Sequence, residues 1–224
     1  MIFGSGTRLL APLLEDYLPS MKVIRIYKST TPEARINCLD INNIEDLEDI
    51  LANLEKEYGN LEIDFVGAAS MNQSEMFVTL DQSNIEEFLS TGVNSYVRVK
   101  KILLKYMIRS KYGRLVFLSS FRSVHMAIGT SLYSATKAFG ETLFTAIGKE
   151  YGRLGISSSV IRMGYFDGKM LDVLKSKGSE NIPASFSNAR VGTSEDLCSA
   201  IRFTFNNPMT NGGIIELDGG LHFG

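Results

Sequence analysis

Midway along the chain runs the sequence Leu115-Val-Phe-Leu-Ser-Ser120-Phe-Arg-Ser-Val-His-Met-Ala-Ile-Gly-Thr-Ser-Leu-Tyr133-Ser-Ala-Thr-Lys137. It begins with an apolar run typical of a buried strand, and a helix is predicted to start near Tyr133. Tyr133 and Lys137 are four residues apart, so a helix places both side chains on one face. An ammonium group close to a phenol lowers the phenol pKa from its usual value of about 10, which suits acid–base chemistry near neutral pH.

Ser120 stands at the predicted carboxyl end of that strand, where open α/β sheets bind their ligands. A hydroxyl at this place can hydrogen-bond the oxygen of a reacting carbonyl. A tyrosine and a lysine at this spacing also occur on helix surfaces that have no catalytic role. The interpretation therefore depends on what the rest of the chain places around them.

Strands and helices are predicted to alternate on both sides of this stretch. Strand patterns cover residues 1–3, 22–27, 34–40, 61–67, 114–119, 156–161 and 214–217, and helix patterns cover residues 7–18, 44–58, 83–109, 133–151 and 195–205. Such alternation predicts an α/β fold, a doubly wound parallel sheet of about seven strands with helices on both faces. We expect a single domain over residues 1–224, with a small substrate-loop region at about residues 165–191.

Two segments have the small residues that a bound ligand requires close to the backbone. Gly4-Ser5-Gly6-Thr7-Arg8 lies between the first predicted strand and its helix, an arrangement that binds phosphate groups, although a plain tight turn explains it equally well. Gly67-Ala68-Ala69-Ser70 ends the strand over residues 61–67. Both segments follow strands, so they are expected at the ligand-binding edge of the sheet.

The composition excludes several classes of protein. With 44% hydrophobic residues, 21% charged residues and a net charge of −2, the chain is typical of a globular protein and has no basic surface for nucleic acid. Its two cysteines are too few for a disulfide framework, and no Cys/His spacing indicates a metal site. No segment approaches the ~20 apolar residues of a membrane span, so we expect a cytoplasmic protein with no membrane partner.

Taken in order, these motifs resemble those of the short-chain dehydrogenase/reductase family over essentially the whole chain. Tyr133-Ser-Ala-Thr-Lys137 is similar to the family's Tyr-x-x-x-Lys motif, and residues 113–120 are similar to its fifth strand, which ends at the catalytic serine, here Ser120. Asn94 is similar to the asparagine of the long fourth helix, and Asp40-Ile41 to the pair beside the adenine. Residues 211–220 look like the family's usual glycine-rich ending.

The resemblance implies a Rossmann fold and a reaction. Tyr133 would give a proton to a carbonyl oxygen or take one from an alcohol, and Ser120 would polarise the carbonyl. Lys137 would lower the pKa of Tyr133 and bind the nicotinamide ribose, while Asn94 would hold a water molecule that relays protons to Lys137. The implied cofactor-binding residues are Gly4, Ser5, Gly6, Thr7, Arg8, Lys28, Ser29, Asp40, Ile41, Ala68, Ala69, Tyr133, Lys137, Gly164 and Phe166.

Three segments depart from the family pattern, and one of them bears on the cofactor. The glycine loop is shortened, Gly67-Ala-Ala-Ser70 replaces Asn-Asn-Ala-Gly, and Met163-Gly164 replaces Pro-Gly. After the second strand the family places a carboxylate where NAD is preferred, but here Lys28 and Ser29 follow Tyr27. Cations and hydroxyls suit a 2′-phosphate, so NADP(H) is favoured over NAD(H).

The resulting hypothesis is an NADP(H)-dependent oxidoreductase that interconverts a carbonyl and an alcohol on a small organic substrate. One alternative is a redox-silent binding or assembly subunit of the same fold, and another is a lyase or isomerase that uses the same acid–base residues. Arg122 and His125 are candidate substrate contacts, although solvated loop positions are the favoured interpretation of both. The family usually assembles through its two long helices, so we expect a homodimer or homotetramer.

Overall fold

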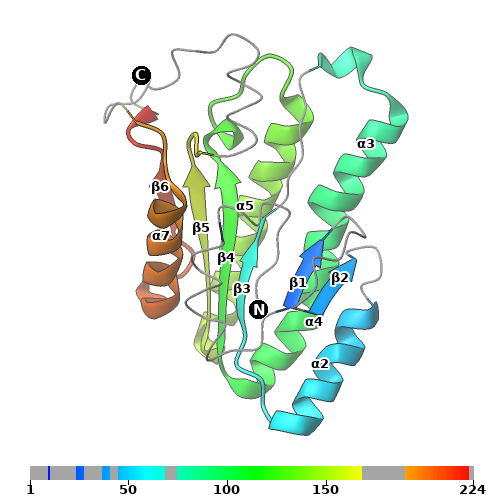
Figure 1. Ribbon diagram of the computed structural model, residues 1–224, viewed down its shortest axis with the longest axis vertical. Coiled ribbons are helices and arrows are strands. Elements are labelled where there is room, and N and C mark those ends of the chain that lie inside the picture. The colour runs from blue at the N-terminus through cyan, green and yellow to red at the C-terminus, as the bar shows by residue number, and fades with distance from the viewer. Residues whose placement is uncertain are drawn as a thin grey trace.

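The computed structural model describes residue 10 and residues 24–27, 37–40, 45–68, 75–167 and 190–221 (Figure 1). The strands are β1 (Ile24–Tyr27), β2 (Asn37–Asp40), β3 (Asp64–Gly67), β4 (Gly113–Ser120), β5 (Ile156–Met163) and β6 (Ile214–Leu217). The helices are α2 (Glu45–Tyr58), α3 (Gln82–Leu89), α4 (Ser95–Ser110), α5 (Ser131–Tyr151) and α7 (Ser194–Asn206). The predicted first strand and all of the first helix except Leu10 lie outside the described residues.

All described strands pair in parallel. β3, β4, β5 and β6 form one sheet in that order, and β1 pairs with β2. From β2 onward, helices connect each strand to the next along the chain, because two parallel neighbours need a crossover between them. The predicted α/β fold with a parallel sheet is confirmed, and the bounds of the described strands agree with the predicted ones to within three residues.

Helices cover both faces of the four-stranded sheet, as Figure 1 shows for α5 on one side and α7 on the other. Successive strand residues point to opposite faces, so each strand contributes to two cores. One core joins α2, α4 and α5 to the strand residues Phe65, Leu115, Phe117, Ile156 and Val160. The other joins α7 to Val66, Val116, Leu118 and Ile161. Burial on both faces explains why apolar residues stand at consecutive positions in these strands, as in Leu115–Leu118 of β4.

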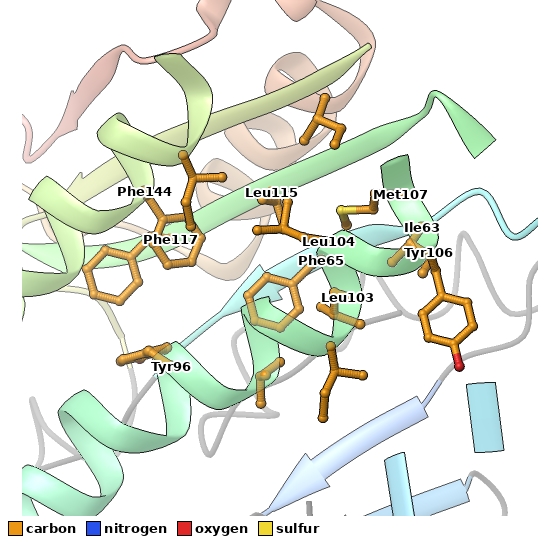
Figure 2. Close-up of a cluster of buried hydrophobic side chains, with 14 of the residues drawn as sticks. Ile63, Phe65, Tyr96, Leu103, Leu104, Tyr106, Met107, Leu115, Phe117 and Phe144 are labelled. Carbon is orange, nitrogen blue, oxygen red and sulfur yellow. The ribbon is translucent and has the colours of Figure 1, made fainter. Parts of the chain in front are cut away.

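Aromatic rings pack tightly between β4 and α5 (Figure 2). The ring of Phe117 stacks on that of Phe144 with centroids 5.0 Å apart, and Tyr96 from α4 meets Phe117 edge-on at 5.2 Å. Gly140 allows this approach, because a Cβ atom there would lie 2.3 Å from the ring of Phe117. The close contact fixes the first turns of α5 beside the carboxyl end of β4.

A lysine lies inside this aromatic core. Lys100 of α4 is 2% exposed, and its Nζ lies 4.0 Å, 4.4 Å and 4.8 Å from the ring centroids of Tyr96, Phe144 and Phe65. Its amine has no hydrogen-bond partner in the described part of the chain, and neither has the Tyr96 hydroxyl. Burial lowers the pKa of Lys100 well below the usual value, because a desolvated ammonium is disfavoured.

The described helices add three details to the predicted pattern. The segment predicted as one helix over residues 83–109 is interrupted by a π-helical turn at Ser90–Asn94, which separates α3 from α4. On α4, Val97 is exposed, because the register brings Tyr96 and Lys100 inward instead. The N-cap of α7 is Thr193, and a capping box joins Thr193 and Asp196.

Candidate active site

The carboxyl ends of three strands meet at one edge of the sheet. β4 and β5 end at the same level, because Ser120 pairs with Met163 in their register. The next residue, Gly164, donates from its amide to Leu217 at the end of β6, at 3.0 Å. A Cβ atom at Gly164 would lie 2.8 Å from the Cα of Asp218, so glycine is required for this close approach. This edge is where parallel α/β sheets bind ligands.

Ser120 is held at that edge by the turn that follows it. It is the last residue of β4 and caps the short 3-10 helix Phe121–Ser123, and its Oγ accepts a hydrogen bond from the backbone amide of Arg122 at 3.2 Å. Only 8% of Ser120 is exposed. Its hydroxyl also hydrogen-bonds the side chain of Tyr133. The strand end and the helix start are therefore joined through these two hydroxyl groups.

Tyr133 lies in the first turn of α5 and is half-buried. Burial raises the pKa of Tyr133 above its usual value, while the hydrogen bond with Ser120 and the positive charge of Arg122 act to lower it. The sequence predicted a lowered pKa from Lys137, but here burial outweighs the groups that lower it. The Nζ of Lys137 lies 5.7 Å from the centroid of the Tyr133 ring.

Lys137 follows one turn later on the same helix and is 5% exposed. Its Nζ donates a hydrogen bond to the carbonyl oxygen of Leu118 at 3.0 Å, so the ammonium is fixed against β4 just before Ser120. Burial lowers the pKa of Lys137 to about 8, while the negative charge of Glu141 acts to raise it. An amine with this pKa holds and releases a proton near physiological pH.

Glu141 is buried one turn beyond Lys137 and ties α5 to the turn around Ser120. Its Oε1 accepts hydrogen bonds from the hydroxyls of Ser119 and Ser123, at 2.6 Å and 2.5 Å. Arg162 of β5 donates to both oxygens of Glu141, at 2.9 Å and 2.7 Å, and also pairs with Glu216. Burial acts to raise the pKa of Glu141, but these hydrogen bonds outweigh it and hold the pKa below its usual range. The carboxylate is therefore charged beside Lys137 at neutral pH.

We expect Glu141→Gln to lower the pKa of Lys137 below about 8, because the variant removes the negative charge that favours the ammonium. The measurement is a pH titration of the lysine side-chain carbons by NMR, with Lys137→Arg to assign the signal. Glu216→Gln is the control, since it removes another carboxylate that pairs with Arg162. An unchanged titration of Lys137 in Glu141→Gln would contradict this account.

The other predicted site residues are placed only in part. Asn94 is exposed at the end of the π-helical turn, whereas Gly92 two residues earlier is buried. The role of Asn94 in holding a water molecule stays a prediction. Ala68 follows β3, Asp40 ends β2, and Phe166 is buried in the core against α7. The remaining predicted cofactor residues lie outside the described residues: Gly4, Ser5, Gly6, Thr7, Arg8, Lys28, Ser29, Ile41 and Ala69.

Two charged residues of the site, Glu141 and Arg162, belong to no motif and were not predicted from the sequence. Glu141 stands four residues after Lys137, and this helical spacing was the signal that could have found it. Arg162 lies within an otherwise uncharged strand, where a charged residue needs a partner. Of the two loop candidates, His125 is exposed as expected, but Arg122 is partly buried and hydrogen-bonded.

In the described ranges, no group of three or more His, Cys, Asp or Glu residues could hold a metal ion. Among the helices that the structure describes, none combines the length and apolar character needed to cross a membrane. The site as described brings together Ser120, Tyr133 and Lys137, and the charges of Arg122 and Glu141 act on Tyr133 and Lys137 respectively.

Comparison with known proteins gives one matching family and many relatives. The model of the short chain dehydrogenase family matches residues 6–178. The 3-oxoacyl-(acyl-carrier-protein) reductase FabG of Haemophilus influenzae is 22% identical over 186 residues, which cover 82% of this chain and 76% of the relative. Nodulation protein G of a Rhizobium species is 25% identical over 183 residues, which cover 80% of this chain and 75% of the relative.

Solved structures are similar over the full length. The structure of ElxO with NADP bound has a TM-score of 0.84 at 21% identity and covers 100% of this chain and 98% of its own. At this identity the likeness shows the fold, an α/β Rossmann fold with a parallel sheet.

Proposed function

Because the chain belongs to the short-chain dehydrogenase/reductase family of NAD(P)-dependent oxidoreductases, we propose that it interconverts a carbonyl and an alcohol on a small organic substrate, with NADP(H) as the cofactor. The observation that supports this most directly is the grouping of Ser120, at the end of β4, with Tyr133 and Lys137 on one face of α5: Ser120 is near enough to act on the pKa of Tyr133, and Lys137 follows one turn along the same helix. A protein that only binds or assembles has no chemical need for these three groups together.

Each residue then has one task in the reduction. The Ser120 hydroxyl hydrogen-bonds the carbonyl oxygen, and Tyr133 gives that oxygen a proton as it becomes an alkoxide. In the oxidation, Tyr133 takes the proton back. Tyr133 has a raised pKa, so it is a protonated acid at neutral pH and is ready to act in the direction of reduction. Lys137, with a pKa of about 8, supplies the next proton.

The donor set of the site fits a nicotinamide nucleotide. The ammonium of Lys137 and the hydroxyl of Tyr133 lie on one face of α5 and can hydrogen-bond the hydroxyls of a ribose. The cofactor supplies the hydride when bound, and the protein supplies orientation and proton transfer. Ala68, directly after β3, is a small residue at the same edge of the sheet and allows a ligand to pass close to the backbone. The relative ElxO was solved with NADP bound.

The test is a fluorescence titration with NADPH and NADH. We expect NADPH to bind more tightly than NADH, and Lys28→Ala to weaken NADPH more than NADH because Lys28 is proposed to contact the 2′-phosphate. Equal losses of affinity for NADPH and NADH would contradict the proposed contact between Lys28 and the 2′-phosphate. If neither cofactor binds at millimolar concentration, the oxidoreductase proposal fails, and the redox-silent subunit and the lyase or isomerase remain as the alternatives.

We further propose a homo-oligomer formed through α4 and α5, the two long helices. Exposed apolar residues on α4, Val97 and Ile108, support this choice of surface.

A further inference from the structure

Arg122 is fixed between the two loops that follow β4 and β5. Its Nη2 donates to the hydroxyl of Tyr165 at 2.8 Å, and its Nη1 donates to the backbone oxygen of His125 at 3.3 Å. Its guanidinium carbon lies 4.5 Å from the centroid of the Phe121 ring, which in turn meets the Tyr165 ring edge-on at 5.1 Å. A side chain held by a ring and two hydrogen bonds is pre-organised, unlike the solvated residue that the sequence suggested.

Among the described residues, no neighbouring carboxylate matches the positive charge of Arg122. Arg109, Arg162 and Arg190 each form an ion pair, but no aspartate or glutamate in the described part of the chain pairs with Arg122. A guanidinium has five N–H donors, and two of those of Arg122 are used as described above. The remaining donors have no acceptor among the described residues. Charged groups with unused donors in a partly buried place favour an anionic partner.

Arg122 is also close to the reacting groups. Its backbone amide donates to Ser120 Oγ at 3.2 Å, and its charge opposes the rise that burial causes in the pKa of Tyr133. A ligand that contacts the guanidinium can therefore place a neighbouring carbonyl near Ser120 and Tyr133. The ring of Phe121 lies against the guanidinium and the hydroxyl of Tyr165 accepts from it, so the charge is partly shielded from water, which strengthens an ionic contact there.

We propose that Arg122 binds an anionic group of the substrate, a carboxylate or a phosphate, and so selects carbonyl compounds that carry a negative charge near the carbonyl. This rests on the proposed reductase function. The reaction itself is unchanged: the reduced cofactor gives a hydride to the carbonyl carbon, Tyr133 gives a proton to the oxygen, and the anionic group keeps its charge throughout. The planar fork of Arg122 suits either anion with two parallel hydrogen bonds.

The test compares charged and neutral substrates of nearly the same shape. Acetoacetate and levulinate are each assayed with NADPH against their primary amides, and dihydroxyacetone phosphate against dihydroxyacetone. We expect kcat/KM to favour the anion by about tenfold to a hundredfold in at least one pair, the range of a charge-assisted hydrogen bond. Preference in the acid pairs alone identifies a carboxylate as the ligand, and preference in the phosphate pair alone identifies a phosphate.

Variants assign that preference to Arg122. Arg122→Gln should bring the ratio of anion to neutral compound close to one, and Arg122→Lys should keep part of it because the charge remains without the fork. The ratio is the readout because Arg122 also acts on Tyr133, which changes the turnover of both members of a pair alike. Arg153→Gln is the matched control, since Arg153 is exposed at the amino end of β5 and carries the same charge away from the site.

Equal kcat/KM for anion and neutral compound in the wild-type enzyme, or turnover of none of the compounds, overturns the proposal. An anion preference that survives in Arg122→Gln also overturns it, because another residue then binds the anion. If Arg122→Gln does not fold, as judged by lost NADPH binding, the proposal is tested by the ratio of kcat/KM for anion to neutral compound in the wild type and in Arg122→Lys. Absence of NADPH binding in the wild-type protein would instead refute the proposed function.

Discussion

Tyr133→Phe is expected to lower kcat about a hundredfold to ten-thousandfold, the usual contribution of general acid–base catalysis, and to leave the Kd for NADPH nearly unchanged. The substitution removes only the hydroxyl that hydrogen-bonds Ser120 and keeps the ring beside Lys137. Ser120 and Lys137 remain in place, because Lys137 is fixed by the carbonyl oxygen of Leu118 rather than by Tyr133. The measurements are steady-state kinetics with an NADPH absorbance assay and a cofactor titration.

The matched control is Tyr151→Phe, which removes a hydroxyl from the last residue of the same helix. We expect this control to keep wild-type turnover, because Tyr151 lies at the opposite end of α5 from the site. Turnover retained in Tyr133→Phe would refute the acid–base role of Tyr133. If turnover and NADPH binding fall together, Tyr133 acts mainly in holding the cofactor.

Lys100→Met is expected to raise the free energy of unfolding at pH 7 by about 3 kcal/mol. Lys100 is buried among the rings of Phe65, Tyr96 and Phe144, and its Nζ has no hydrogen-bond partner in the described ranges. Folding must therefore either remove its proton or bury an unpaired charge, and both oppose folding. Methionine has a similar length and no charge, so it can fill the same space.

The pH dependence tests the cause of this effect. The pKa of Lys100 is lowered in the folded state, so between that pKa and the unfolded value of about 10.4 the unfolded chain binds one more proton. The stability of the wild-type protein should therefore rise with pH across this window relative to that of Lys100→Met, and the difference should shrink toward pH 10. Urea unfolding of both proteins at several pH values measures this difference in the free energy of unfolding.

Lys101→Met is the control for this experiment, because Lys101 is the exposed neighbour of Lys100 on α4. We expect it to change the free energy of unfolding by less than about 0.5 kcal/mol. A Lys100→Met protein that is less stable than the wild type at neutral pH would show that the amine stabilises the aromatic core, and the present account of Lys100 would be wrong.

Local patterns in the sequence were enough to predict the layers of the fold. Alternating strand and helix signals predicted the parallel sheet, and spacing alone brought Tyr133 and Lys137 to one face of α5. The position of Ser120 at the end of β4 followed from the apolar run before it. These features depend on neighbours within a few residues along the chain, which is the range over which sequence patterns carry information.

The electrostatics of the site could not be predicted in the same way. The partners of Glu141 come from β4, from the turn after it and from β5, so they depend on strand register and on how α5 lies over the sheet. Arg122 meets Tyr165 because β4 and β5 end at the same level, so the loops that follow them start side by side. The pKa of Tyr133 is raised by burial, a property of the packed structure that the helical spacing to Lys137 does not contain.

The hydrogen bonds of Glu141 have a consequence for how the protein loses activity when heated. Ser119 and Ser123 stand on either side of Ser120, and both are joined to the same carboxylate on the helix that carries Tyr133. Strand end, turn and helix are therefore joined at one carboxylate: opening the strand end or the turn breaks a buried hydrogen bond, and moving the helix away also breaks the ion pair with Arg162. We therefore expect the proposed catalytic groups not to loosen ahead of the core, so thermal inactivation should coincide with the cooperative unfolding of the sheet.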